Sequence, residues 1–304
     1  DWSSDVCSSD LSEAVLTVAT SEFSVTEGLV ARFNADDIET GEGEQLDKWN
    51  DLVGGYSLLQ NEEKKQPTMK KTALGMKYVE FDGQTSEMIM DSSQVLDLNG
   101  KSNLSIVAFS AFTGTDPESY TYGDTKCTVY FGESGSWGST YLSSYGGFIA
   151  SRFGSGQEGN YIKTVREKQN NDFVMTAMVK DKETEYLYDD GKKIATVTGK
   201  YEQTKNNKTT MMVGKTASGT PSYFQGGISE ILIYDRTLSE EEISNLQSYM
   251  MTKYYLSQLN PILEEAQGIL YEEGAEDKYN SNSWKKLQDS YDQAILIKEQ
   301  IANG

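Results

Sequence analysis

The sequence predicts a mainly β chain, a two-sheet antiparallel sandwich or jelly roll, that ends in a helical hairpin. Two observations carry this prediction. Short alternating or apolar segments separated by turn residues recur from about residue 28 to residue 236, which is typical of sandwiches. After residue 239, apolar residues recur at helical spacing instead. With 304 residues, 37% of them hydrophobic and 11% aromatic, the chain can build one large β domain and a small appendage.

Individual segments justify the β assignment. Residues 28–33 (GLVARF) alternate between apolar and polar, and residues 77–83 (KYVEFDG) run into an Asp-Gly turn. Residues 104–113 (LSIVAFSAFT) form a long apolar run, which we expect at the centre of a sheet. In residues 186–197 (YLYDDGKKIATV), the pair Asp190-Gly191 lies between two short alternating segments and predicts a tight hairpin.

The C-terminal region has a helical pattern. Ser239 is followed three positions later by Glu242, which is the spacing of a capping box, and this helix is expected to lie against the sandwich and to end near Tyr254. Pro261 is expected to open the next helix, and Ser283 to cap the one after a polar turn. These last two helices form a hairpin that cannot bury both apolar stripes, so a third helix is expected beyond them.

The first residues stand apart from the rest. Residues 1–11 (DWSSDVCSSDL) match, codon by codon, the translation of a common short-read sequencing adapter. We therefore expect them to be an assembly artefact and exclude them from reasoning about the fold. The remaining chain is expected to be a fragment of a longer protein, with a linker at 12–26, the sandwich at 27–256 and a partial helical module at 257–304.

Composition and charge exclude several classes of function. The formal net charge of −20 disfavours nucleic acid and anionic lipid as partners. No apolar run approaches the length of a membrane span, so membrane insertion is not expected. Histidine is absent, which excludes Ser-His-Asp and Cys-His nucleophilic catalysis and His-ligated zinc. Cys7 lies in the adapter-like segment, so Cys127 cannot belong to a disulfide framework.

Short motifs at both ends of the β region resemble one known family. WNDLVGG (49–55), QPT (66–68) and KYVEFDG are similar to the opening of laminin-G-like, concanavalin A-like lectin/glucanase domains, and residues 227–254 resemble their closing strand and helix. The hairpin at Asp190-Gly191 lies where the family has its own. The resemblance covers about residues 27–254 and implies a concanavalin A-like jelly roll of two antiparallel sheets, one of them concave.

The C-terminal region is similar to a second family. LNPILEEAQGIL (259–270) and SWKKLQDSYDQAILI (283–297) resemble the FIVAR module, a small three-helix domain of Gram-positive surface proteins and large exported glycosidases. The partial module spans about residues 258–304, because the chain stops before the last helix of the family. The resemblance implies a secreted or cell-surface protein, linked to other domains and from a Gram-positive bacterium.

A region rich in aromatic residues between residues 120 and 152 is the candidate ligand site. Exposed aromatic rings stack on the apolar faces of sugars, with polar groups beside them. These rings can instead pack on the core or along a sheet edge, and the arginine can form a surface ion pair. Trp49, which precedes an Asn-Asp turn, is expected to pack in the core or against a loop. The predicted carbohydrate-binding residues are Trp137, Tyr141, Tyr145, Tyr120, Tyr122 and Arg152.

Catalysis and calcium binding find less support. Glycosidases of this architecture place their acids on one strand as Glu-x-Asp-x-(x)-Glu, and the two outer glutamates act as nucleophile and acid/base. The nearest pattern here, Glu80, Asp82 and Glu87, is interrupted by the turn at Gly83, so no catalytic residue is assigned. Some laminin-G-like domains hold calcium, which needs several oxygen ligands. The sequence leaves calcium open without assigning ligands, since no repeat organises the loop acids Asp36, Asp37, Asp82 and Asp235.

These features predict a non-catalytic carbohydrate-binding module of a larger secreted or cell-surface protein, either a glycosidase or an adhesin, with a glycan as its partner. Two alternatives stay open. Burial of Trp137 and its neighbouring tyrosines would favour a protein-binding adhesion or spacer domain. A cleft that holds two carboxyl groups would favour a divergent glycoside hydrolase.

Overall fold

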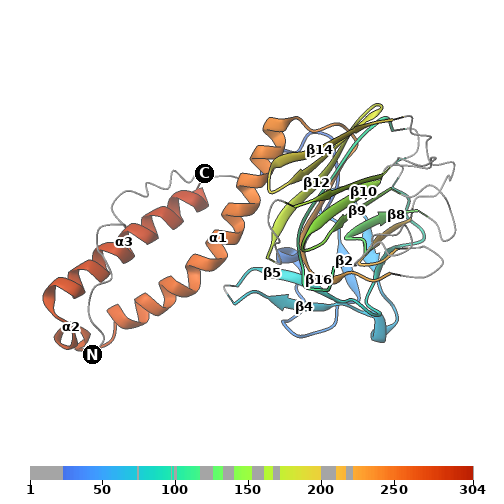
Figure 1. Cartoon of the computed structure of the whole chain (residues 1–304). Helices are drawn as coiled ribbons and strands as arrows, with labels where there is room; N and C mark the ends of the chain where they lie inside the picture. Colours follow the sequence, from blue (N-terminus) through green and yellow to red (C-terminus); the bar gives the residue numbers. More distant parts are fainter. Residues whose placement is uncertain are drawn as a thin grey trace.

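The computed structural model of the chain is a β-sandwich from which a helical hairpin projects (Figure 1). The predicted mainly β class with C-terminal helices is therefore confirmed. The described residues are 23–73, 75–96, 98, 101–116, 126–132, 140–152, 161–166, 172–199, 210–216 and 222–303.

Sheet A, the first of the two sheets, is antiparallel throughout its described strands. Its long central strand β7 is buried from Leu104 to Phe112, as the apolar run predicted. The last strand of the sandwich, β16, lies between β7 and β5 and also pairs with β1. In spatial order the sheet holds β14 (Lys192–Thr198), β13 (Thr184–Asp189), β12 (Val174–Asp181), β7 (Asn103–Phe112), β16 (Gln225–Tyr234), β5 (Lys77–Asp82) and β4 (Thr68–Lys71), with β1 (Leu29–Asn34) beside β16.

Sheet B is antiparallel as well and consists of shorter strands. In spatial order it holds β11 (Tyr161–Val165), β10 (Phe148–Arg152), β9 (Thr140–Ser144), β8 (Val129–Phe131), β15 (Met211–Val213), β6 (Met88–Met90), β3 (Ser57–Leu59) and β2 (Lys48–Asn50). Two single 3-10 turns, at Ala35–Asp37 and Glu63–Lys65, connect strands of the two sheets.

The predicted hairpin joins β13 to β14. Asp190 and Gly191 adopt φ angles of +51° and +77°, the left-handed conformation that a two-residue hairpin turn requires at both positions. The hairpin forms one edge of sheet A, and its prediction from the sequence is confirmed.

The main core lies between the two sheets and includes the predicted core residue Trp49. Its ring is fully buried and meets Phe33 edge-on at 6.0 Å. The following Asp51 explains the WNDLVGG motif, because its carboxylate accepts backbone N–H groups at 2.5 Å from Arg32 and from Gly54. These bonds hold the turn after β2 against β1.

Helix α1 (Glu240–Leu270) covers part of the outer face of sheet A, where Ile243, Leu246 and Met250 belong to a second buried cluster. The predicted capping box at its start is confirmed, since the Ser239 hydroxyl and the Glu242 carboxylate each accept the other's backbone N–H. No helix in the described part of the chain is long and apolar enough to cross a membrane.

Three predicted helix boundaries are wrong, namely the end near Tyr254, the start at Pro261 and the cap at Ser283. The helix predicted to end near Tyr254 continues through Pro261 to Leu270, since a proline removes one backbone hydrogen bond without forbidding the helix, and α3 packs against α1. The cap of α3 is Asn280 instead of Ser283, because the Asn280 side chain accepts the Ser283 N–H at 2.9 Å. The two shorter helices are α2 (Ala275–Lys278) and α3 (Ser281–Asn303).

Candidate functional site

The predicted aromatic site is described only in part. Trp137, Tyr120 and Tyr122 lie outside the described residues. Tyr141, Tyr145 and Arg152 are described, and their exposed fractions are 2%, 0% and 3%. None of these three therefore presents an open surface to a ligand in the way that the sequence led us to expect.

Tyr145 is a core residue. Its ring stacks on Phe148 at 4.2 Å and meets Phe112 edge-on at 5.2 Å. Its phenol oxygen accepts the backbone N–H of Lys126 at 2.6 Å. A large ring with a satisfied hydroxyl is stable in a core, and this packing corrects the expectation that Tyr145 stacks on a sugar.

Tyr141 and Arg152 lie side by side on the other face of sheet B. In the pairing of β9 with β10, Tyr141 lies directly opposite Arg152. Leu142, the residue after Tyr141, points into the inter-sheet core, so Tyr141 points to the opposite face of the sheet. Tyr141 packs with Cys127 and Ala150 in a small buried cluster. The structure thus brings two of the predicted residues together and separates Tyr145 from them, yet all three are buried.

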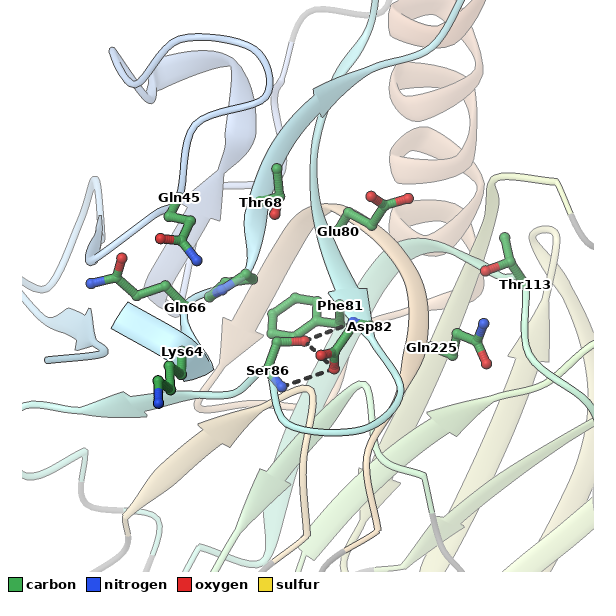
Figure 2. A pocket seen from close by; sticks show the side chains of 11 residues that line it. Gln45, Lys64, Gln66, Thr68, Glu80, Phe81, Asp82, Ser86, Thr113 and Gln225 are labelled. Carbon is green, nitrogen blue, oxygen red and sulfur yellow. Dashed lines mark hydrogen bonds between the residues drawn. The ribbon is translucent and has the colours of Figure 1, made fainter. Parts of the chain in front are cut away.

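The outer face of sheet A instead carries an open polar groove of about 350 Å³ (Figure 2). Along β5, Val79 and Phe81 point into the inter-sheet core, so Glu80 points to the outer face. Pairing in the sheet sets Thr68 opposite Glu80. The lining consists of Gln45, Lys64, Gln66, Pro67, Thr68, Glu80, Phe81, Asp82, Ser86, Thr113 and Gln225.

A rigid turn after β5 forms the floor of the groove. The Asp82 carboxylate accepts the backbone N–H groups of Gln84, Thr85 and Ser86 at 2.8–2.9 Å, and the hydroxyls of Thr85 and Ser86 at 2.8 Å. Although burial acts to raise its pKa, these hydrogen bonds hold the pKa of Asp82 well below its ordinary value. Asp82 is thus ionised and committed to its own turn.

Five other side chains that line the groove are uncommitted. They make no hydrogen bond or ion pair with any described residue, and they are Lys64, Thr68, Glu80, Thr113 and Gln225. By contrast, the Gln45 and Gln66 amides donate to backbone carbonyls at 3.0 Å and 2.9 Å. Figure 2 places Gln45, Gln66 and Lys64 on one side of Asp82, and Thr113 and Gln225 on the other.

Part of the groove could have been found from the sequence. The alternation of KYVEFDG places Glu80 and Asp82 on one face of a strand, and QPT contributes Thr68. Thr113 and Gln225 carry no local signal, because they meet only through the pairing of β7 with β16, where the Thr113 N–H donates to the Gln225 carbonyl at 3.0 Å.

The loop acids do not form a calcium site. Asp36 pairs with Lys253, and Asp235 with Lys101, each at 3.0 Å. Asp37 accepts from the Asn34 amide, and Asp82 is saturated by its turn. Within the described ranges no three carboxylate, cysteine or histidine side chains gather as metal ligands.

The acids of the interrupted glycosidase pattern are also separated. Glu87 is 3% exposed and lies 3.7 Å from Lys65, with Lys215 as a second ion-pair partner, and it does not line the groove. Glu185, an acid outside this pattern, is fully buried and accepts the Ser151 hydroxyl at 2.5 Å. Neither acid can reach a ligand held beside Glu80.

A family model described as the concanavalin A-like lectin/glucanases superfamily matches residues 91–244. The chain belongs to this superfamily. The resemblance of its laminin-G-like region is therefore confirmed, and the jelly-roll sandwich is the fold of its family. A search among curated proteins finds no match.

Several solved structures are similar to this chain at low sequence identity. The binding domain of Paraclostridial Mosquitocidal Protein 1 is 16% identical with a TM-score of 0.48, covering 72% of this chain and 52% of its own. Domain 4 of AbnA, an extracellular arabinanase from Geobacillus stearothermophilus in complex with arabinotriose, is 16% identical with a TM-score of 0.47. The match covers 72% of this chain and 98% of that domain. A Trypanosoma rangeli sialidase is 13% identical with a TM-score of 0.47, covering 75% and 33%. The chain thus spans about half of the first and a third of the last.

Proposed function

We propose that the chain is a non-catalytic carbohydrate-binding module and that its groove on sheet A contacts the sugar. The observation that carries this proposal is a set of uncommitted polar or charged side chains around one open groove, namely Lys64, Thr68, Glu80, Thr113 and Gln225. Membership of a superfamily that includes lectins supports it, although a fold by itself does not decide function.

The chemistry of the groove suits a sugar. Hydroxyl and amide groups both donate and accept hydrogen bonds, and a carboxylate accepts them, which together match the hydroxyls around a sugar ring. A volume of about 350 Å³ lies at the small end of ligand sites and fits a short stretch of glycan.

The acids support a binding role over a catalytic one. Hydrolysis of a glycosidic bond needs a second carboxyl group with a raised pKa beside the first. In the groove, the second carboxyl group belongs to Asp82. Burial acts to raise the pKa of Asp82, but the hydrogen bonds of its turn outweigh burial and hold this pKa low. A divergent hydrolase is the less favoured alternative for this reason.

The wider context extends the proposal. The helical region supports a spacer that links the module to other domains of a secreted or cell-surface protein, a glycosidase or an adhesin, from a Gram-positive bacterium. Trp137, Tyr120 and Tyr122 stay proposed as a second contact region, and calcium as a cofactor without assigned ligands. A protein-binding adhesion or spacer domain remains the alternative that burial of Tyr141 and Tyr145 favours.

A glycan array tests the proposal. The whole chain is applied with calcium and with a chelator, beside Gln225→Ala, Trp137→Ala and the control Glu183→Gln, an exposed acid in the turn between β12 and β13. We expect selective binding that Gln225→Ala weakens and Glu183→Gln does not. Loss in Trp137→Ala alone would move the site to the aromatic region, and absence of binding to every glycan would favour the adhesion or spacer domain.

A further inference from the structure

The charged side chains that line the groove differ in how free they are to contact a ligand. Its lining contains two carboxylates, Glu80 and Asp82, and one cation, Lys64. Both oxygens of Asp82 are engaged by the turn that follows it. Glu80, by contrast, makes no hydrogen bond or ion pair with a described residue, so its carboxylate is the one with oxygens open to a ligand.

A free carboxylate has a defined preference among ligands. It accepts hydrogen bonds and donates none, and its two oxygens can each accept one of two neighbouring sugar hydroxyls. The hydroxyl of Thr113 and the amide of Gln225 line the same groove and can bond further hydroxyls as donors or acceptors. This arrangement holds an uncharged diol without leaving the carboxylate desolvated and unpaired.

An anionic sugar would meet repulsion in the same place. A uronate, sialate or sulfate group would bring a like charge next to Glu80, where water is partly displaced and charges interact more strongly than in bulk solvent. The Lys64 ammonium has no described partner either, but it lies on the other side of Asp82 from Thr113 and Gln225 and forms no ion pair with Glu80 that would neutralise it. The net charge of −20 adds repulsion at longer range.

We infer that the groove selects glycans without anionic groups and that Glu80 is the residue that holds them, through hydrogen bonds from neighbouring hydroxyls. This inference rests on the proposed function and specifies its ligand class. It also gives the two acids different roles: Glu80 binds the sugar, and Asp82 positions the turn.

The test compares ligand classes on the whole chain. An array presents neutral cello-, xylo-, arabino- and galacto-oligosaccharides beside oligogalacturonides and sialylated and sulfated glycans, each at 50 mM and at 500 mM salt. Wild type is compared with Glu80→Gln, which keeps the shape and removes the charge, and with Glu183→Gln. Thermal unfolding of each variant shows whether it is folded.

We expect binding to neutral glycans that is at least tenfold weaker in Glu80→Gln, unchanged in Glu183→Gln and nearly independent of salt. Selective binding of anionic glycans that falls with salt would overturn the inference while leaving a carbohydrate-binding module. Neutral binding that survives Glu80→Gln would do the same. No binding in any class would reject the proposed function and this inference with it.

Discussion

The outer face of sheet A carries two surfaces of opposite character along the same strands. Under α1, β7 and β16 present Val107, Phe109 and Leu232, which are fully buried. At the other end the same two strands lead to Thr113 and Gln225, which are exposed and line the groove. The first surface stabilises the fold, whereas the second has polar groups left over for a ligand.

Gly227 marks the boundary between these two surfaces. A side chain added there would come within 2.6 Å of Tyr78 and 2.8 Å of Phe173. The missing side chain therefore lets two aromatic rings, which lie 5.2 Å apart, close the apolar part of the face. Packing thus divides a single face into two parts, and we expect these parts to respond differently to mutation.

The largest expected effect is on the covered part. Glu230 is fully buried beneath α1, where it pairs with Arg32 at 2.9 Å and Lys253 at 3.1 Å. Glu230→Ala leaves these cations without their shared partner, and we expect it to lower the free energy of unfolding by about 4 kcal/mol. Urea denaturation measures this, and a loss below about 1 kcal/mol would mean that the ion pairs do not hold the helix to the sheet.

An intermediate effect is expected on the face of sheet A that is turned toward sheet B, where Glu185 contacts Ser151. Burial raises the pKa of Glu185 to about 7, against the opposing effects of Ser151 and Lys180. Between the unfolded value of about 4.3 and this folded value, the folded state keeps a proton that the unfolded state releases. Rising pH therefore favours unfolding across this window.

We expect the wild type to lose about 2 kcal/mol more stability than Glu185→Gln between pH 5 and pH 7.5. Lys180, whose pKa burial lowers to about 8, titrates above this window. Denaturant titrations at the two pH values measure the difference, with Glu183→Gln as the control for an exposed acid. Equal pH dependence in wild type and Glu185→Gln would show that Glu185 does not keep its proton.

The smallest effect is expected in the groove. Thr113 and Gln225 are exposed and their side chains have no described partner, so replacing both by alanine should change the free energy of unfolding by less than about 0.5 kcal/mol. Differential scanning calorimetry measures this, and a clearly lowered melting temperature would mean that these residues serve the fold and not a ligand.

Much of the fold could be predicted because its signals are local. The apolar run of β7, the left-handed pair Asp190-Gly191 and the Ser239 capping box all act within a few residues. The continuation of α1 through Pro261 could not be predicted, since the contact with α3 that accompanies it comes from a distant segment.

The site was predicted less well for a related reason. Aromatic residues are abundant both in cores and in sugar sites, so composition cannot separate the two roles. Tyr145 lies in the core because it packs against Phe148, three residues later, and against Phe112 on β7, and the contact with Phe112 does not follow from the sequence near Tyr145. The shared face of Glu80 and Asp82 follows from strand alternation, although their roles do not.

Local sequence signals predicted the fold class, the strand periodicity, the hairpin and the start of α1, because backbone geometry acts over short distances. Composition also excluded histidine chemistry. Only the tertiary structure decided which parts of sheet A are covered, since coverage depends on where α1 and β16 pack. Packing of distant segments buries Phe109 in the core and leaves the carboxylate oxygens of Glu80 open to a ligand.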